Sequence, residues 1–382
     1  MYKVKLMNKI SSVGLDYFNE DYEYGETLEN EDAILLRSAS LHEYEFTKNV
    51  KAIARAGAGV NNIPVEKCSE KGIVVFNTPG ANANAVKELV LCALFLSSRK
   101  IVESIEWVNT LKDDENVGKT AEKGKSNFVG PEIEGKKLGV IGLGAIGVLV
   151  ANAANKLGME VYGYDPYMSV DAAWNLSRYV NHVTNIDDLY RQCDFITIHV
   201  PLNDGTKNFI NKDSFDKMKD GVKLLNFARG GLVDEDALLV ALDGNKVEYY
   251  VTDFPSLKVI QNDKVIAIPH LGASTEESEE NCAVKAAQEL MDYLTYGNIS
   301  NSVNLPNAKM DMNSPFRITC IHENKPKMIS QITDILKDAN IENLMNKSKK
   351  DIAYTIIDLD SEVDVSPIEK INGMIRVSTY KK

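Results

Sequence analysis

The chain has 382 residues, of which 44% are hydrophobic and 26% charged, as in an ordinary globular protein with room for two or three domains. Its 43 lysines and arginines are outnumbered by 55 acidic residues, and the net charge of −12 argues against a nucleic-acid-binding surface. No apolar run is long enough to span a membrane, and the N-terminus lacks the apolar region of a secretory signal. Five scattered cysteines form no C-x-x-C pair, so we expect reduced thiols, no metal site and a cytoplasmic location.

The first part of the chain alternates apolar segments with turns, which is typical of an α/β domain. Strands are predicted in KVKLMN, DAILLRS, VKAIARAGAG and GIVVFNTPG, the last two running into turn residues. Residues 83–111 are apolar at helical spacing and contain no proline, which predicts one long helix into a second domain. The polar segment 112–126 then predicts an exposed, mobile connection.

A glycine-rich turn follows a short apolar strand in the segment KKLGVIGLGAIG. Gly142, Gly144 and Gly147 have the G-x-G-x-x-G spacing of a strand-to-helix turn that binds the pyrophosphate of a dinucleotide on free N–H groups. A second apolar strand, 160–164, ends in Asp165, eighteen residues after Gly147, where an acid accepts from ribose hydroxyls and repels a 2′-phosphate. The turn therefore favours NAD over NADP. The alternative is a glycine loop that only tightens α/β packing.

Four further strands, CDFITIHVP, VKLLNFAR, VEYYVTDFP and KVIAIPH, complete this α/β unit. Ligands bind at the carboxyl ends of parallel strands, so we expect His199, Arg229, Asp253 and His270 around one crevice. A helix over 276–296 is predicted to close the unit. The segment GNISNSVNLP is then expected to return to the first domain and make it discontinuous.

The residue types at these strand ends fit hydride transfer to or from a 2-hydroxy acid. His270 is the candidate proton-transfer group, because an unperturbed imidazole has a pKa of about 6.5. Arg229 provides a fixed fork of donors that matches a carboxylate, and Asp253 is placed to accept from a nicotinamide carboxamide. Taken singly, His270 also fits a hydrogen-bonded loop histidine and Arg229 a surface ion pair.

The motifs GLGAIG, HVPLNDGT, NFARGGLVDEDAL and PHLGAST resemble the D-isomer-specific 2-hydroxyacid dehydrogenase family. LLRSAS, ARAGAGVNNI and NTPGANANAVKEL are similar to its 3-phosphoglycerate dehydrogenase branch, and the resemblance spans residues 1 to about 306. It implies NAD-dependent oxidation of 3-phospho-D-glycerate to 3-phosphohydroxypyruvate and the reverse, the first step of L-serine biosynthesis. It also implies a homodimer or homotetramer. Reduction of another 2-oxo acid, such as 2-oxoglutarate or glyoxylate, remains an alternative.

The expected fold class is α/β, with two Rossmann-like doubly wound parallel-sheet domains and a C-terminal ferredoxin-like βαββαβ domain. The expected substrate-binding domain comprises 1–98 and 285–306, and the NAD-binding domain 99–284. The resemblance assigns the cofactor to Gly142, Gly144, Ala145, Ile146, Gly147, Asp165, His199, Val200, Pro201, Thr206, Ala228, Asp253, Gly272 and Ala273. It places the substrate carboxylate against Arg229 and the turn Ala58, Gly59 and Val60, and the phosphate against Arg37, Ser38, Arg55 and Asn82.

The tail, residues 315–382, alternates strands and helices as βαββαβ and resembles an ACT domain, which in this branch often binds serine and pairs between subunits. The positions that match the serine site are His322 and Asn324, with Asn340 the nearest candidate for a third. Lys327 stands where the family usually has glycine, and the connection after the first helix is shorter than usual. A structural role in oligomerisation is the alternative to a serine effector site.

One departure affects the catalytic group itself. The family places a glutamate a few residues after the aspartate that matches Asp253, where it orients the catalytic histidine and raises its pKa. Leu257 and Lys258 occupy that place here. In a serine-protease triad, disabling the orienting aspartate costs about 10⁴ in rate. Three interpretations remain open: Asp263 or Glu248 takes over, activity is weak, or the chain is a noncatalytic NAD-binding regulatory paralogue.

Overall fold

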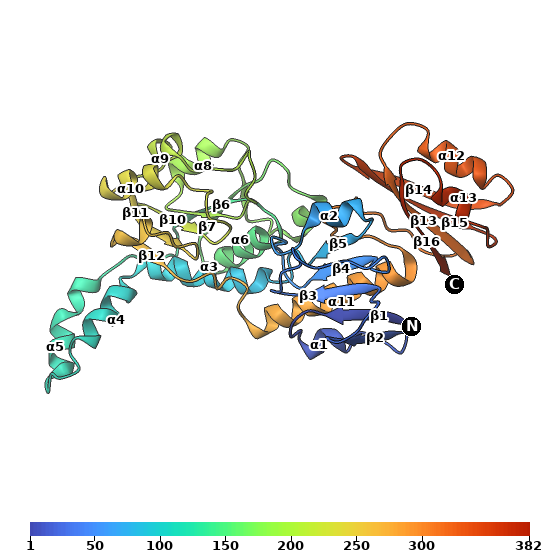
Figure 1. Cartoon of the computed structure of the whole chain (residues 1–382). Coiled ribbons are helices and arrows are strands. Elements are labelled where there is room, and N and C mark those ends of the chain that lie inside the picture. Colours follow the sequence, from blue (N-terminus) through green and yellow to red (C-terminus); the bar gives the residue numbers. More distant parts are fainter. The chain divides into compact units, whose positions relative to one another are not determined.

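The computed structural model describes all 382 residues and divides into two compact units (Figure 1). The first unit comprises residues 1–82 and 276–382, and the second residues 83–275. No helix in either unit combines the length and the apolar character that crossing a lipid bilayer requires.

The first unit begins with a five-stranded, wholly parallel sheet in the order β2-β1-β3-β4-β5. Its strands are β1 (Tyr2–Leu6), β2 (Tyr22–Gly25), β3 (Ala33–Leu36), β4 (Ala52–Arg55) and β5 (Val74–Asn77). Four of the five were predicted. The prediction missed β2 because its sequence, YEYG, is short and half polar, as suits a strand at the edge of the sheet.

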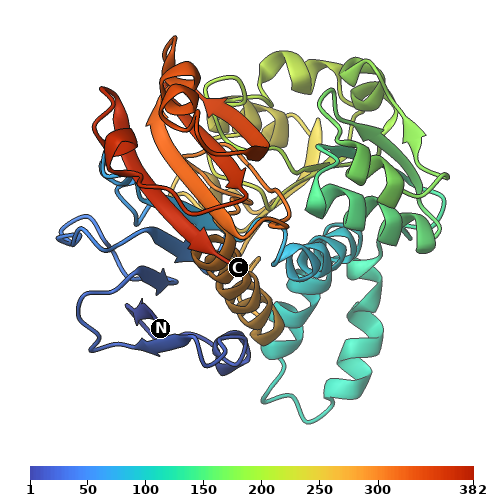
Figure 2. The same cartoon turned by 90° about the vertical axis from the view of Figure 1, so that its right-hand side faces the viewer.

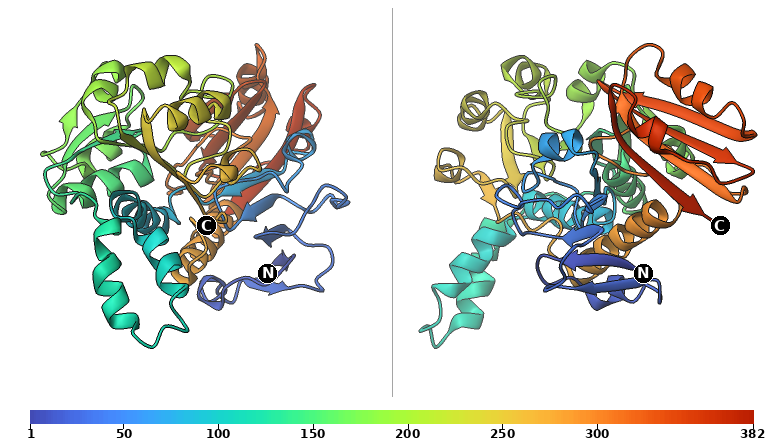
Figure 3. Two further views of the ribbon diagram at one scale, coloured as in Figure 1. Left: turned by 90° about the vertical axis from the view of Figure 1, so that its left-hand side faces the viewer. Right: turned by 45° about the vertical axis from the view of Figure 1, so that its right-hand side comes forward.

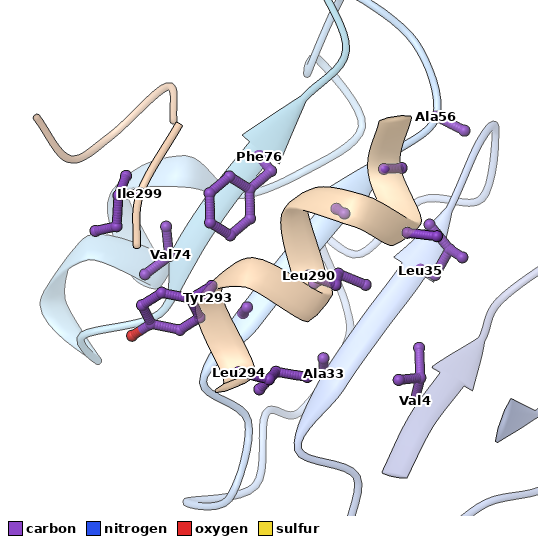
Figure 4. Close-up of a cluster of buried hydrophobic side chains, with 14 of the residues drawn as sticks. Val4, Ala33, Leu35, Ala56, Val74, Phe76, Leu290, Tyr293, Leu294 and Ile299 are labelled. Atoms are coloured by element: carbon purple, nitrogen blue, oxygen red, sulfur yellow. The ribbon is translucent and has the colours of Figure 1, made fainter. Parts of the chain in front are cut away.

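Side chains of these strands alternate between two hydrophobic clusters, one on each face of the sheet. On β3, Leu35 packs on the face covered by α1 (Ser12–Leu15) and α11 (Glu276–Tyr296), while Ile34 packs on the face covered by α2 (Val65–Glu70). Figure 4 shows Leu290, Tyr293 and Leu294 of α11 against residues of β1, β3 and β5. The predicted helix 276–296 is confirmed.

The segment after α11 returns to this sheet, as predicted. The Val303 N–H donates to the Val75 carbonyl at 2.9 Å, and the side-chain oxygen of Asn304 accepts from the Val75 N–H at 2.9 Å. The Asn304 amide also donates to the Ile73 carbonyl at 2.9 Å. Residues 1–82 and the segment after 298 therefore form one discontinuous fold.

The second unit contains a seven-stranded parallel sheet in the order β12-β11-β10-β9-β6-β7-β8. Its strands are β6 (Lys137–Ile141), β7 (Glu160–Tyr164), β8 (Asn181–His182), β9 (Phe195–Ile198), β10 (Val222–Asn226), β11 (Val247–Thr252) and β12 (Val265–Ala267). Counted along the chain, this order is 3-2-1-4-5-6-7, which contains the Rossmann order. The predicted α/β fold with parallel sheets is confirmed.

Helices cover both faces of this sheet (Figure 3). Phe195 points to the face of α3 (Ala83–Ser98), α6 (Ala145–Lys156) and α7 (Val170–Asn175), whereas Ile196 points to the opposite face. That opposite face carries α8 (Ile186–Gln192), α9 (Lys212–Lys217) and α10 (Glu235–Asp243), and a short 3₁₀ turn, Val259–Gln261, precedes β12.

The expectation of one helix over 83–111 is wrong, because α3 ends at Ser98 and α4 runs from Ile101 to Asn109. The hydroxyls of Ser97 and Ser98 donate to the carbonyls of Ala93 and Leu94, both at 2.8 Å. Such back-bonding competes with the backbone ladder and bends or ends a helix.

The expected connection over 112–126 is also more ordered than predicted. It contains α5 (Val117–Gly124) and a 3₁₀ turn, Lys125–Phe128, and α4 and α5 project together from the second unit (Figure 1). The rings of Trp107 and Phe128 lie 5.3 Å apart and join the two helices. A Cβ atom at Gly124 would clash with the Trp107 ring, so only glycine permits this approach. Exposure was predicted correctly, because α5 buries no residue.

The C-terminal part of the first unit is a four-stranded antiparallel sheet in the order β14-β15-β13-β16 (Figure 2). Its elements follow one another as β13 (Phe316–Glu323), α12 (Met328–Ile335), β14 (Ile341–Lys349), β15 (Ile352–Leu359), α13 (Ser366–Glu369) and β16 (Met374–Lys381). The predicted βαββαβ arrangement is confirmed. Lys327 has a φ of 69°, which explains why glycine is the favoured residue at this position.

The unit boundaries lie elsewhere than the expected domain boundaries at 98/99 and 284/285. The whole of α3 belongs to the second unit because it packs on α6, β10 and β11. The whole of α11 belongs to the first because it packs on α1, β3, β4 and β5. Because each of these helices packs as a whole within one unit, the unit boundaries lie directly before α3 and α11.

Candidate active site

The carboxyl ends of the parallel strands in the second unit bring the predicted polar residues to one edge of the sheet. Asn226 at the end of β10 lies in register with Ile198 of β9 and Thr252 of β11, and Thr252 is in register with Ala267 of β12. The segments that follow these strands carry His199, Arg229, Asp253 and His270. The register of the strands places these segments at one edge of the sheet, and the crevice that we expect between them stays a prediction.

The glycine-rich turn has the geometry of a phosphate cradle. Gly142 has a φ of +91°, and a Cβ atom there would lie 2.8 Å from the His199 carbonyl oxygen. A Cβ atom at Gly147 would collide with the Gly142 carbonyl, so both positions require glycine. A Cβ atom at Gly144 would meet nothing within 4 Å, and no side chain caps the start of α6. The open N-terminus of α6 therefore fits a pyrophosphate.

Asp165, which was expected to meet the ribose, also holds the turn itself. Its two carboxylate oxygens accept from the N–H groups of Leu143 and Tyr167, both at 2.8 Å. A carboxylate has about four lone-pair sites, so hydroxyl donors have room on the same group. The position of Asp165 at the end of β7, next to the glycine turn, agrees with its expected role.

His199 is half-buried, and desolvation of its ring lowers its pKa to about 3. Its Nε2 atom pairs with the Thr197 hydroxyl at 2.9 Å, while its Nδ1 atom is buried without a hydrogen-bond partner. The imidazole is therefore neutral at physiological pH. Its neighbours Val200 and Pro201 lead into a turn that the Thr206 hydroxyl ties by donating to the Pro201 carbonyl at 2.6 Å.

Arg229 is exposed on a loop that Asn226 organises. The buried amide of Asn226 donates to the Arg229 carbonyl at 3.0 Å and accepts from the Ala228 N–H at 3.2 Å. The Arg229 guanidinium donates to the Ala228 carbonyl at 2.7 Å. Asn226 was not among the predicted site residues. Its signal in the sequence was a polar residue at the end of a largely apolar strand.

Asp253 is the buried acid of the site, with 1% of its surface exposed. Its Oδ2 atom accepts from the Gly272 N–H at 3.3 Å, and its Oδ1 atom is buried without a hydrogen-bond partner. Burial raises the pKa of Asp253, while the positive charges of His270 and Arg229 act against that rise. His270 is exposed and its ring lies 4.7 Å from that of Phe254. The structure therefore groups Asp253 with both predicted catalytic residues.

Neither acid considered as a substitute for the missing glutamate lies at this edge. Glu248 is near the start of β11 and pairs with Lys223 at 2.5 Å, and Asp263 is exposed just before β12. Because β11 and β12 are parallel, both acids lie at the opposite edge of the sheet from His270. The expectation that either one supports His270 is wrong. Leu257 is exposed, and Lys258 pairs with Asp236 of α10.

In the first unit, the residues expected to hold the substrate follow the ends of β3, β4 and β5. The turn Ala58, Gly59 and Val60 is anchored from two sides. The Asn77 amide donates to the Ala58 carbonyl at 2.5 Å, and the Arg55 guanidinium donates to the Gly59 carbonyl.

The two arginines expected at the phosphate differ in their contacts. Arg55 also donates through Nε to the Arg37 carbonyl at 2.9 Å, so its guanidinium supports two loops. Arg37 instead forms an ion pair with Glu279 of α11 at 2.6 Å. Ser38 is exposed just after the end of β3, and Asn82 is half-buried directly before α3.

The three residues matched to a serine site have different environments. His322 is buried, with Nδ1 at 2.8 Å from the Glu323 carbonyl and Nε2 at 2.9 Å from the Thr355 hydroxyl, and burial lowers its pKa. Asn324 and Asn340 are exposed. Hydrogen bonds inside the sheet thus occupy both nitrogens of His322.

All five cysteines are free thiols, and only Cys92 among them is exposed. No group of three or more histidine, cysteine, aspartate or glutamate side chains is arranged to hold a metal ion.

Comparison with known proteins places the chain in one family. Residues 92–272 match the model of the NAD-binding domain of D-isomer specific 2-hydroxyacid dehydrogenases. The hydroxypyruvate reductase of Thermotoga maritima is 38% identical over 275 residues, covering 69% of this chain and 85% of that protein. The D-3-phosphoglycerate dehydrogenase of Methanocaldococcus jannaschii is 33% identical over 317 residues, covering 81% of this chain but 58% of that protein.

The chain thus spans little more than half the length of that archaeal relative. Among solved structures, the NAD⁺-bound 3-phosphoglycerate dehydrogenase of Entamoeba histolytica aligns with a TM-score of 0.61 at 27% identity, over 79% of this chain and 98% of that one. The glycine cradle, the acid at the end of β7 and the Arg229, Asp253 and His270 group lie within or beside the matched domain. The chain belongs to the D-isomer-specific 2-hydroxyacid dehydrogenase family.

Proposed function

We propose that the chain is an NAD-dependent dehydrogenase that interconverts 3-phospho-D-glycerate and 3-phosphohydroxypyruvate, the first step of L-serine biosynthesis. One observation carries the chemical part of the proposal. A guanidinium, a buried carboxylate and an imidazole follow three adjacent strands, and the charges of Arg229 and His270 both act on Asp253. The phosphoglycerate dehydrogenases among its relatives support the substrate.

The cofactor fits the second unit. The N–H groups at the start of α6, including those of Ala145 and Ile146, are oriented for the pyrophosphate, and Asp165 is placed for the ribose. Nicotinamide, when bound, supplies the hydride acceptor or donor of the reaction. We assign the remaining cofactor contacts to segments at the same edge: Val200, Pro201, Thr206, Ala228, Gly272 and Ala273.

His270 and Arg229 divide the remaining chemistry between them. In the oxidative direction His270 takes the proton of the 2-hydroxyl as the carbonyl forms, and in reduction it returns that proton. Arg229 holds the substrate carboxylate with paired donors and keeps C2 in position. The exposure of both side chains makes them accessible to a substrate.

In this proposal Asp253 orients His270, the role that the missing glutamate has in the family. A buried carboxylate next to a histidine stabilises the charge of the protonated ring and fixes the tautomer of the neutral one. The unpartnered Oδ1 atom provides the acceptor for that interaction or for the nicotinamide carboxamide. Because Glu248 and Asp263 lie at the other edge of the sheet, Asp253 is the best placed acid for the role.

A second candidate is reduction of an unphosphorylated 2-oxo acid. The ion pair between Arg37 and Glu279 and the use of Arg55 as a loop support favour it, since both withdraw cationic groups from a phosphate. The similarity to a hydroxypyruvate reductase agrees with this candidate.

The C-terminal βαββαβ part is proposed to be an ACT domain in a cytoplasmic homo-oligomer. The edge strand β14 is exposed along most of its length, as a strand that pairs with another subunit would be in the free chain. The internal hydrogen bonds of His322 favour a structural role over a serine site of the usual kind.

The test is NADH oxidation with 3-phosphohydroxypyruvate, compared with hydroxypyruvate, 2-oxoglutarate and glyoxylate. Rapid, selective turnover of the phosphorylated substrate would support the proposal. Arg229→Ala is expected to lower kcat/KM by about a hundredfold or more while NADH binding stays unchanged. Tight NADH binding with negligible turnover of every substrate would instead identify a regulatory paralogue.

A further inference from the structure

Arg37 is held at its backbone and paired at its side chain. The Asn8 side-chain oxygen accepts from the Arg37 N–H at 3.0 Å, and the Asn62 amide donates to the Arg37 carbonyl at 3.3 Å. The guanidinium then reaches Glu279 at 2.6 Å, with 42% of the Arg37 side chain and 44% of the Glu279 side chain exposed. An incoming anion meets this guanidinium only in competition with Glu279.

The neighbouring Arg55 does not offer an equivalent group. Its donors reach the carbonyls of Arg37 and Gly59, which hold the loops after β3 and β4. A Cβ atom at Gly59 would lie 2.9 Å from the Arg55 guanidinium, which shows how closely the turn packs on it. Moving Arg55 toward a ligand would release both loops.

Glu279 cannot withdraw by a shift of its helix. A Cβ atom at Gly14 would lie 2.5 Å from the backbone of Ala283, so α1 and α11 are in tight contact one turn after Glu279. The Lys285 ammonium also donates to the Pro79 carbonyl at 2.6 Å. Rotation of the Glu279 or the Arg37 side chain is therefore what separates the pair, and its cost is small because an exposed ion pair contributes about 0–1 kcal/mol.

We propose that Glu279 is a specificity-determining residue: by neutralising part of the Arg37 charge, it lowers the preference of the site for substrates that carry a phosphate at that position. The inference rests on the proposed dehydrogenase function. A phosphorylated substrate must displace Glu279 and then remain next to its charge, whereas hydroxypyruvate places no charge there. Glu279 thus sets the ratio between the two activities and leaves the chemistry at His270 untouched.

The experiment compares Glu279→Gln with Glu277→Gln. Both changes remove one charge from the first turn of α11, but Glu277 is exposed and forms no ion pair with Arg37. The ratio of kcat/KM for 3-phosphohydroxypyruvate over hydroxypyruvate is expected to rise about tenfold in Glu279→Gln and little in Glu277→Gln, through KM rather than kcat. An unchanged ratio, or equal rises in both variants, would overturn the proposal.

A second measurement separates this inference from the proposed function. Inorganic phosphate is titrated while Tm is followed, which requires no turnover. Glu279→Gln is expected to show a larger phosphate-dependent rise in Tm than Glu277→Gln. The double variant Arg37→Gln/Glu279→Gln should not show this larger rise. If phosphate raises Tm equally in the two single variants, the proposed role of Glu279 is wrong. If no substrate is reduced by NADH, only the proposed dehydrogenase function is wrong.

Discussion

At the scale of single residues, two arginines at the ends of adjacent strands have different structural roles. Arg55 binds backbone carbonyls and shapes the turn at Gly59, while Arg37 faces an acid from a helix more than two hundred residues later in the chain. Both were expected to contact a phosphate. A guanidinium with several donors serves equally well as an internal support, and only its neighbours decide which use it has.

Asp253 gives the first prediction at this scale. Reduction of a 2-oxo acid needs a proton donor, and His270 is the donor that we propose. The Asp253 carboxylate interacts electrostatically with His270, and Asp253→Asn is therefore expected to reduce kcat and to change its dependence on pH. The pH dependence of kcat for hydroxypyruvate reduction measures both effects.

Asp263→Asn is the matched control, because Asp263 lies before β12 at the opposite edge of the sheet. Its profile should coincide with that of the unmodified chain. If Asp253→Asn instead weakened NADH binding and left the pH profile in place, Asp253 would be a cofactor ligand alone.

At the scale of elements, α11 carries a buried acid whose ionisation opposes folding. Glu289 is 7% exposed, its Oε1 atom accepts from the Asn301 amide at 2.6 Å, and its Oε2 atom is buried without a partner. Burial raises its pKa from 4.5 to about 7. The folded state therefore holds a proton that the unfolded state loses between these values, so the free energy of unfolding falls as pH rises through that range.

Glu289→Gln should remove this pH dependence. The variant is expected to differ little from the unmodified chain at pH 5 and to be more stable by about 3 kcal/mol at pH 8. Urea denaturation at the two pH values measures the difference, with the exposed Glu277→Gln as control. A gain of the same size at both values would show that ionisation is not its cause.

For some helices and strands, the local sequence pattern was sufficient to predict the bounds of the element. The helix 276–296 and the strand 160–164 were placed at their observed bounds, because long periodic segments and short apolar runs reflect local preferences. The break after Ser98 was missed. The helix ends there because each serine hydroxyl binds a carbonyl of the preceding turn in the folded chain. The sequence did not indicate this end, because the apolar spacing continues past Ser98.

At the scale of the whole molecule, the C-terminal sheet and the N-terminal sheet of the first unit share one core around the end of α11. Tyr354 donates to the Gly297 carbonyl at 2.6 Å, and its ring belongs to the same hydrophobic cluster as Tyr293. Arg317 donates to the Tyr296 carbonyl at 2.8 Å and pairs with Asp358 through two bonds of 2.5 and 2.9 Å. Neither charged side chain is exposed.

Breaking this pair should destabilise the chain strongly. Asp358→Ala leaves a buried guanidinium without its counter-charge, and a loss of about 3–5 kcal/mol is expected in urea denaturation. Combining Arg317→Met with Asp358→Leu removes both charges and should cost less than Asp358→Ala alone. Additive losses in the double variant would show that the two residues act independently.

The amino-acid sequence by itself determined the α/β fold, the glycine cradle and the family, because these depend on local spacing and on motifs whose residues lie close together in the chain. The tertiary structure decided which charged groups meet. In the folded chain, Glu248 and Asp263 lie at the opposite edge of the sheet from the site. Asp253 is grouped with Arg229 and His270, and Glu279 forms an ion pair with Arg37. Such pairings follow from sheet register and helix packing, and both bring together residues that no local pattern connects.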